Sequence, residues 1–199
     1  GASAGLCLYP DRYAYRYSGG PIIGDSALVL ECRVSGNAPL PSALPAVAWR
    51  VGLDVNPLQV TDDEDVRWLE SLVWPEQVDR FTILRRAVQI ARTDPARIVD
   101  GDLTRDLVAV AEDAPSDATL VVFHSAVVSY LDEQQRTAFR SQLAELVEQR
   151  DVVWVSNEGP GVIVDVPIPD GGPVPFVVAR DAVPLAYADP HGGSLDWFG

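Results

Sequence analysis

At 199 residues the chain has the length of one domain, and its formal net charge of −14 argues against binding of nucleic-acid backbones by charge. A composition of 47% hydrophobic and 22% charged residues is typical of a globular protein with an apolar core. The sequence contains no run of roughly 18 apolar residues, so it predicts no membrane-spanning helix. All 15 basic residues are arginines, a bias that indicates a GC-rich genome rather than a binding surface.

The cysteines and histidines indicate neither a disulfide framework nor a metal site. Two cysteines, Cys7 and Cys32, are typical of a reducing compartment, and no basic segment followed by an apolar one indicates a signal peptide, so we expect a cytoplasmic protein. His124 and His191 are isolated from each other and from the cysteines, so we predict no metal. The chain contains no methionine, and we therefore expect it to be a fragment or a processed product.

The chain begins with GASAG (residues 1–5), in which small residues surround one serine. This stretch is typical of a glycine-rich turn that lets a nucleotide approach the backbone. It also matches G-x-S-x-G, the nucleophile elbow of serine hydrolases. A third interpretation is the irregular start of a fragment, without any chemistry.

Strand patterns follow this opening stretch. Residues 13–17 (YAYRY) and 27–34 (ALVLECRV) alternate as strands do, and turns rich in Gly and Pro separate and follow them. We predict a β-excursion over residues 13–45, paired like a hairpin within 13–34.

From residue 46 onward, strand patterns alternate with helix patterns. Thr61 and Glu64 fit a capping box at the start of one helix, and Pro75 fits the first turn of the next. Asp132 fits the N-cap of a later helix. The predicted elements are a strand over 46–60, helices over 61–92, a strand over 96–103, a helix over 104–114, a strand over 118–131, a helix over 133–149, and strands over 151–157, 175–181 and 184–190.

This order predicts an α/β protein whose sheet is mostly parallel and covered on both faces. The last two predicted strands are joined by a short link and predict an antiparallel C-terminal hairpin. No internal repeat divides the chain, so we expect one domain over residues 1–199.

Polar residues end four consecutive predicted strands. Ligands of open α/β sheets bind beyond the carboxyl ends of the strands, so this set marks a candidate site. The residues are Asp54 and Asn56, Gly101 and Asp102, His124 and Ser125, and Asn157 and Glu158.

Three of these residues have a ligand-binding interpretation and a structural alternative. Asp54 is suited to accept hydrogen bonds from ribose hydroxyls, but its stretch DVNP is also a good turn sequence. Asp54 lies 49 residues after Gly5, whereas in a nucleotide-binding unit the acid lies roughly 20 residues after the glycine-rich loop. The β-excursion over residues 13–45 must therefore be an insertion. Asp102 could bind an adenine amino group or start a helix. His124 could line a pocket, act as a base, or be a hydrogen-bonded structural histidine.

The stretches GASAG, RVGLDVNP, VDGDL and TLVVFHSAVVSYL resemble, in this order, the motifs of class I S-adenosylmethionine-dependent methyltransferases. Nearly the whole chain is more closely similar to an uncharacterised bacterial family called domain of unknown function 2332. That similarity lies in GASAGL, VWPEQVDR, LVVFHSAV, WVSNEGPG and DPHG. The resemblance implies a Rossmann-like, methyltransferase-type sandwich.

The resemblance also implies a binding site for S-adenosylmethionine. Ser3 stands where the methyltransferases have the middle glycine of the first loop, which narrows the approach of the cofactor. The first strand of their sheet, expected just before Gly1, is missing, so we expect this chain to lack an N-terminal region that includes it. The implied cofactor-binding residues are Gly1, Ala2, Ser3, Gly5, Asp54, Asn56, Asp102 and His124.

We therefore expect a methyltransferase-like protein that binds a small molecule, without a nucleic-acid or membrane partner. The methyl acceptor and the oligomeric state stay open. Candidates for a catalytic role, from their position alone, are His124, Asn157 and Glu158.

Two alternatives stay open beside this function. The domain could keep the fold without catalysis and use it to bind another protein. It could also be a serine hydrolase with Ser3 as nucleophile, Asp165 or Asp170 as the acid, and His191 as the base. Against the hydrolase, those enzymes build most of their sheet before the elbow, whereas here the strand–helix units follow it.

Overall fold

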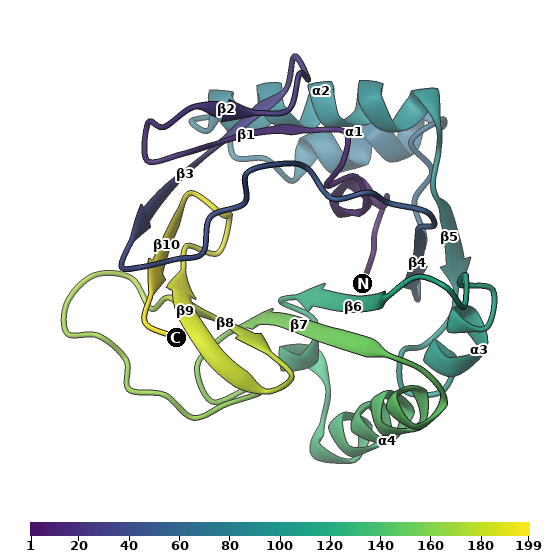
Figure 1. Ribbon diagram of the computed structural model, residues 1–199. Coiled ribbons are helices and arrows are strands. Elements are labelled where there is room, and N and C mark those ends of the chain that lie inside the picture. Colours follow the sequence, from purple (N-terminus) through teal and green to yellow (C-terminus); the bar gives the residue numbers. More distant parts are fainter.

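Ten strands form two sheets in the computed structural model, which describes residues 1–199 (Figure 1). The larger sheet has eight strands in the order β2-β1-β3-β10-β9-β8-β7-β6, and the smaller sheet pairs β4 with β5. The strands are β1 (Ala14–Tyr17), β2 (Ile22–Ile23), β3 (Val29–Ser35), β4 (Val51–Asp54), β5 (Arg97–Asp100), β6 (Leu120–Ser125), β7 (Val152–Glu158), β8 (Phe176–Arg180), β9 (Val183–Ala188) and β10 (Ser194–Trp197).

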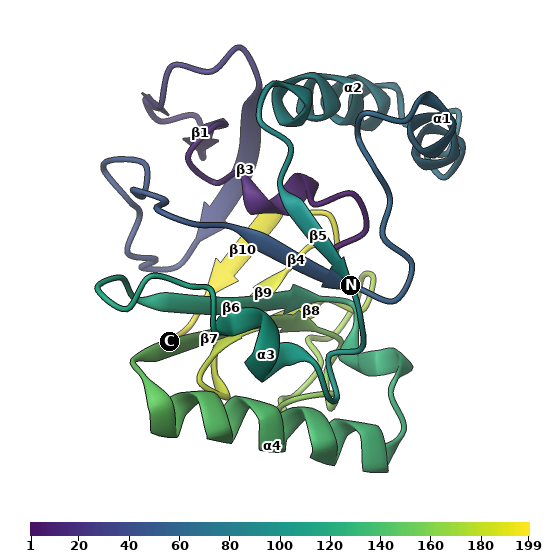
Figure 2. The same ribbon diagram turned by 90° about the vertical axis from the view of Figure 1, so that its right-hand side faces the viewer.

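The helices lie on both sides of this arrangement. In Figure 2, α3 and α4 lie beside β6 and β7, whereas α1 and α2 lie at the opposite end of the molecule. None of the helices has both the length and the apolar character needed to cross a bilayer. The helices are α1 (Asp63–Ser71), α2 (Val78–Thr93), α3 (Leu107–Ala111) and α4 (Glu133–Gln149), with the 3-10 turns η1 (Leu6–Leu8) and η2 (Val128–Tyr130).

The expectation of a mostly parallel sheet is wrong, because the large sheet is mixed. Its parallel pairs are β1·β3, β3·β10 and β6·β7, and its antiparallel pairs are β1·β2, β10·β9, β9·β8 and β8·β7. The C-terminal strands cause the difference, since they turn back on one another instead of crossing over through helices. The predicted antiparallel hairpin is confirmed as β8–β9, with left-handed backbone at Asp181 and Ala182 in its turn.

The excursion over 13–45 exists, but its pairing differs from the prediction. Its two main strands, β1 and β3, pair with one another in parallel, and the short β2 pairs with the outer edge of β1. On its other edge β3 pairs with β10, a strand that the sequence did not predict. The excursion is therefore continuous with the large sheet rather than a separate hairpin.

Helix starts follow their capping residues. Asp132 accepts from the backbone N–H of Gln135, whose side chain returns a bond to Asp132, so the predicted cap is confirmed. The predicted capping box at Thr61 is wrong by one residue. The N-cap is Asp62, which accepts from the N–H of Glu64 at 2.7 Å. A carboxylate at this position also interacts favourably with the positive end of the helix dipole.

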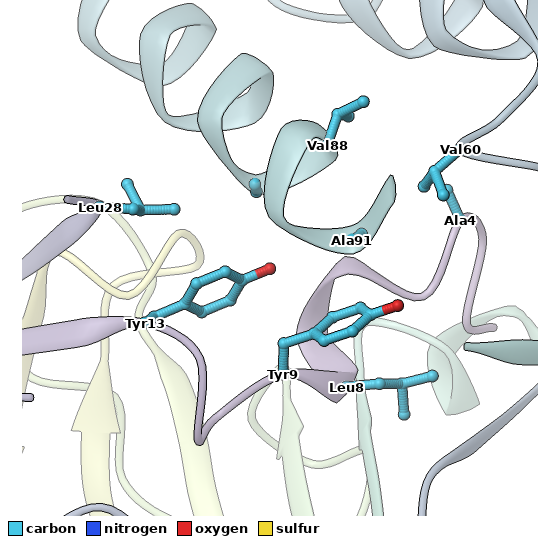
Figure 3. Close-up of a cluster of buried hydrophobic side chains, with 9 residues drawn as sticks. Ala4, Leu8, Tyr9, Tyr13, Leu28, Val60, Val88 and Ala91 are labelled. Carbon is cyan, nitrogen blue, oxygen red and sulfur yellow. The ribbon is translucent and has the colours of Figure 1, made fainter. Parts of the chain in front are cut away.

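The largest apolar cluster joins the N-terminal segment to one face of α2, as Figure 3 shows. Tyr9, with 1% of its surface exposed, anchors this contact. Its hydroxyl donates to the carbonyl of Asp94 at 2.9 Å and accepts from the N–H of Ala96 at 2.7 Å. Two smaller clusters pack α3 and α4 on β6 and β7. The large cluster contains Ala4, Leu8, Tyr9, Tyr13, Leu28, Val60, Ala87, Val88 and Ala91.

We expect Tyr9→Phe to lower the free energy of unfolding by about 1–2 kcal/mol, because it removes a buried hydroxyl that bonds a partly buried carbonyl and a partly buried N–H. Urea unfolding followed by circular dichroism measures the change. Tyr130→Phe is the matched control, since Tyr130 is 85% exposed and should lose almost nothing. Equal effects of the two substitutions would contradict the role given to the Tyr9 hydroxyl.

Candidate functional site

The first residues of the chain lie against the carboxyl end of β4. In Figure 1 the N-terminus lies between β4 and β6. The N–H of Ala2 donates to the carbonyl of Leu53 at 3.1 Å, and the N–H of Leu58 donates to the carbonyl of Ser3 at 3.2 Å. The GASAG stretch is therefore bound on both sides by the chain around β4.

Two glycines allow this close approach. Gly5 has φ of 72°, a left-handed conformation that glycine adopts at little cost. On Gly52, in the middle of β4, a Cβ atom would lie only 2.5 Å from the Cβ of Ala2 and 2.8 Å from Cδ1 of Ile98. Ser3 also has a left-handed backbone, with φ of 53°, at the position where the resembling family has glycine.

The carboxylate of Asp54 holds the loop in place. Its Oδ2 accepts from the N–H of Ser3 at 2.8 Å, and its Oδ1 accepts from the N–H of Asn56 at 2.8 Å. The amino group of Gly1 lies 3.9 Å from Oδ2, and the Asp54 side chain is 14% exposed. Each carboxylate oxygen can accept more than one hydrogen bond, so Asp54 keeps capacity for a ligand.

The amino group of Gly1 lies in a partly buried, negatively charged environment. Burial lowers the pKa of this amino group below its ordinary value, although the negative charges of Asp54 and Glu158 act in the opposite direction. The acidic residues at the carboxyl ends of β4 and β7 thus both act on the amino group of Gly1. Their charges favour a cationic or hydrogen-bond-donating group there.

Asp102 lies in the turn between β5 and α3 and does not start the helix, because α3 begins at Leu107 with Asp106 as its N-cap. It accepts from the backbone N–H of Thr104 at 2.9 Å and from its hydroxyl at 2.8 Å. These bonds lower the pKa of the Asp102 carboxyl below its ordinary value. The N–H of Asp102 itself donates to Asp106 at 2.7 Å. Both bonds from Thr104 are to Oδ1, so Oδ2 of Asp102 keeps capacity to accept from an adenine amino group.

Both ring nitrogens of His124 are bonded within the protein. Nδ1 lies 2.7 Å from Oε1 of Glu158, and the indole N–H of Trp154 donates to Nε2 at 3.0 Å. This network fits a neutral ring with its proton on Nδ1, because a protonated Nε2 would face the indole N–H. The edge of Phe139, from α4, faces the ring. A role for His124 as a base would require one of these bonds to break.

Glu158 is the most deeply buried charged residue of the site, with 1% of its surface exposed. Its Oε1 accepts from the N–H groups of Val127 at 2.8 Å and Val128 at 3.0 Å, in addition to His124. Burial is the largest single influence and raises the pKa of Glu158. The hydrogen bonds from His124, Val127 and Val128 together hold that pKa below its ordinary value. Glu158 is therefore ionised at neutral pH.

Ser125 and Asn157 alternate with this buried pair along β6 and β7, so they lie on the opposite face of the sheet. The Asn157 amide donates to the Ser125 hydroxyl at 3.0 Å. Two buried acceptors have no partner, Oδ1 of Asn157 and Oε2 of Glu158. Buried polar atoms are normally paired, so these two can accept hydrogen bonds from a ligand.

The structure does not bring the hydrolase residues together. The backbone N–H of His191 donates to Asp189, and its Nε2 lies 3.2 Å from the Arg80 guanidinium. Neither Ser3 nor the predicted acids, Asp165 and Asp170, bind His191. The structure also contains no group of three or more His, Cys, Asp or Glu residues that could hold a metal ion.

The sequence missed the residues that surround His124. Trp154 and the N–H groups of Val127 and Val128 were not predicted to belong to the site. The available signal was the alternation of β7, which places Trp154, Ser156 and Glu158 on one face. That signal becomes useful only when the pairing of His124 with Ser156 is known.

We expect Glu158→Gln to weaken the fold by roughly 1–3 kcal/mol at pH 7, because three hydrogen bonds lose their charged acceptor. The folded-state pKa of Glu158 is lowered, so its stabilising contribution is present above the ordinary pKa and is lost as the pH falls through the lowered value. The variant should lose this part of the decline in stability below about pH 5.

Urea unfolding between neutral and acidic pH measures both effects. Glu148→Gln is the control, since Glu148 lies exposed on α4 and makes no hydrogen bond with its side chain. If Glu158→Gln has the same acid dependence as the parent chain, the ionised Glu158 does not stabilise the fold.

The comparison with known protein families covers almost the entire chain. A family model described as "Uncharacterized protein conserved in bacteria (DUF2332)" matches residues 1–197. No curated protein and no solved structure matches the chain. Because the family match spans the loop, the four strand ends and the C-terminal hairpin together, the chain belongs to the bacterial family DUF2332.

Proposed function

We propose that this protein binds S-adenosylmethionine as a methyltransferase-like protein. The observation that carries the proposal is the hydrogen bond from the N–H of Ser3 to Asp54, which joins the first loop to the acid at the end of β4 across 51 positions of the chain. In nucleotide-binding α/β folds, such a loop approaches the ligand and such an acid binds ribose hydroxyls.

The surrounding residues fit a ligand with a nucleoside and a cationic part. Asp54 supplies an ionic acceptor for ribose hydroxyls, and the backbone of residues 1–5 supplies a surface without bulky side chains. The unpaired Oδ1 of Asn157 and Oε2 of Glu158 are buried acceptors at the carboxyl end of β7, on opposite faces of the sheet. The negative charges of Asp54 and Glu158 favour a ligand that carries positive charge.

The bound cofactor would supply an activated methyl group on a sulfonium, so the protein needs mainly to orient the acceptor and exclude water. Asn157 can orient an acceptor through its unpaired oxygen. His124 contributes by holding Glu158, because both its ring nitrogens are already bonded. The geometry therefore favours catalysis by positioning over catalysis by a free histidine base.

One observation favours the alternative of a protein-binding domain. The end of α1 and the turn that leads to α2 expose large apolar side chains, with exposed fractions of 57% for Trp68, 57% for Leu72 and 71% for Trp74. Adjacent exposed apolar groups of this kind often mark a contact with another molecule. This surface lies outside the site at the strand ends, so the two functions do not exclude one another.

We expect isothermal titration calorimetry to detect binding of S-adenosylmethionine or S-adenosylhomocysteine, and Asp54→Asn to weaken it at least ten-fold, about 1.4 kcal/mol or more. The substitution keeps the size of the side chain but removes the charged acceptor. Asp100→Asn is the matched control, because Asp100 ends the neighbouring strand β5, is exposed, and makes no hydrogen bond with its side chain.

The thermal unfolding of both variants must be measured beside the titration, since Asp54 also holds the loop. An absence of heat with a folded parent chain at millimolar ligand contradicts the proposed function. Equal affinities of the parent chain and Asp54→Asn would contradict the role of Asp54 while leaving cofactor binding intact.

A further inference from the structure

Arg80 and His191 bring together two stretches of the chain, residues 73–80 (VWPEQVDR) and 189–192 (DPHG), that have no part in the site at the strand ends. Arg80 lies in the first turn of α2, and His191 lies in the turn between β9 and β10. Nη1 of Arg80 lies 3.2 Å from Nε2 of His191 and donates to Oε1 of Gln77 at 2.7 Å. Two segments that are 111 positions apart therefore form one cluster of polar side chains.

Strand register places this cluster at the same edge of the large sheet as the ends of β6 and β7. β7 and β9 are both antiparallel to β8, so they run in the same direction. Glu158, at the end of β7, pairs with Val177, and Val177 pairs with Tyr187 near the end of β9. The carboxyl ends of β7 and β9 are therefore level, and they lie two strand spacings, or about 10 Å, apart. His191 follows the end of β9 by three residues, on the side of the sheet where α/β proteins bind their ligands.

Arg80 has no carboxylate partner, although the chain is strongly acidic. Nine of the 15 arginines form an ion pair with an aspartate or a glutamate, but Arg80 does not. The acid of the neighbouring turn, Asp189, is engaged within that turn, because its Oδ1 accepts from the N–H groups of His191 at 2.9 Å and Gly193 at 3.3 Å. An arginine that only joined α2 to this turn would be expected to bind such a carboxylate. The charge of Arg80 is therefore left for another partner.

The two contacts of Arg80 use one end of its guanidinium and leave the other end free. A guanidinium only donates, so Nε2 of His191 accepts, and its ring is neutral with the proton on Nδ1. The two N–H groups of Nη1 are thus directed to Gln77 and His191, whereas Nε and Nη2 make no hydrogen bond within the protein. Nε and Nη2 form the edge of the guanidinium that matches two oxygens of a carboxylate or a phosphate. Gln77 and His191 therefore hold Arg80 in an orientation that suits an oxyanion.

Charges of opposite sign lie at different positions along this edge of the molecule. Asp54 and Glu158 are negative and favour the positive part of a ligand, as their action on the amino group of Gly1 shows. Arg80 is positive, and the register places its cluster two strands beyond the end of β7. Because Arg80 is half-buried and His191 is exposed, a ligand can reach the pair from solvent. A cationic cofactor and an anionic second substrate would thus be attracted to separate places.

We propose that Arg80, held by Gln77 and His191, binds the carboxylate or phosphate group of the methyl acceptor, so that the substrate is a small anionic molecule. Nε and Nη2 of Arg80 bind two oxygens of this group, and the rest of the acceptor extends toward the ends of β6 and β7. His191 is a positioning residue, because it acts through Arg80. The assignment of the anion to a methyl acceptor rests on the proposed function, whereas the anion site itself does not.

The test titrates the 199-residue chain with sodium phosphate and with sodium acetate, at an ionic strength kept constant with sodium chloride. Nuclear magnetic resonance follows the Nε–H of Arg80 and the backbone amides of His191 and Gly192. We expect at least one of the two anions to shift these signals in a saturable way. Arg80→Gln should weaken binding of that anion at least about ten-fold, because hydrogen bonds to a charged group are lost. Arg140→Gln is the matched control, since Arg140 is exposed on α4 and also has no carboxylate partner.

Conservative variants separate anion binding from a merely structural contact. Arg80→Lys keeps the charge but lacks the planar pair of donors, so it should bind the anion several-fold more weakly than the parent chain. His191→Leu removes the acceptor that orients Arg80 and should also weaken binding. His191→Gln supplies an acceptor again and should restore the affinity. Thermal unfolding of each variant, measured beside the titration, shows that the chain is folded.

A second titration with the same anion, in the presence of saturating S-adenosylhomocysteine, distinguishes the acceptor from the cofactor. If Arg80 binds the acceptor, the anion should bind with unchanged affinity. Competition between the two would mean that Arg80 binds the carboxylate of the cofactor, and this result overturns the proposal.

The proposal is also overturned if neither anion gives a saturable shift in the folded parent chain, or if Arg80→Gln binds the anion as tightly as the parent chain does. These results are distinct from a failure of the proposed function. A chain that binds the anion at Arg80 but does not bind S-adenosylhomocysteine would keep the anion site and lose the assignment of its ligand to a methyl acceptor.

Discussion

The carboxylate of Asp54 is the interaction on which the arrangement of the site depends. It binds the N–H groups of Ser3 and Asn56, and so connects the first loop, the end of β4 and the segment that follows it. The loop can lie this close only because Gly52 has no side chain beneath Ala2. One carboxylate and one glycine therefore bring the first loop, which is remote in sequence, to the carboxyl end of β4.

A second carboxylate, which is buried, organises β6, β7 and the turn that follows β6. Glu158 accepts hydrogen bonds from His124 and from the N–H groups of Val127 and Val128 in the turn after β6. Trp154 completes the network by donating to His124. A buried charge is tolerated when hydrogen bonds to it are numerous, and here they lower its pKa despite its burial. The same arrangement leaves Oε2 of Glu158 unpaired, so the residue that stabilises the turn also has one acceptor available.

The sequence predicted local features well and long-range pairing poorly. The cap at Asp132 and the polar end of β4 at Asp54 depend on a few adjacent residues, and both were found at the predicted positions. The strand β10 was missed because four residues give little periodicity, and the parallel pairing of β1 with β3 depends on residues far apart in the chain. At the site, the ends of β4, β6 and β7 lie where they were predicted, whereas β5 ends at Asp100, before Gly101 and Asp102. The face on which His124 lies could not be predicted without its neighbours Trp154 and Glu158. The pairing of the strands therefore decides whether a polar side chain faces a ligand site or the apolar core.

These separate observations have a common physical cause, which is that β4 and β6 are not paired with one another. In a parallel α/β sheet each central strand is covered on both edges, and the loops at the carboxyl ends are held by the strands beneath them. Here the GASAG loop has β4 on one side but no paired strand directly beneath it, so Asp54 has to hold it through side-chain contacts.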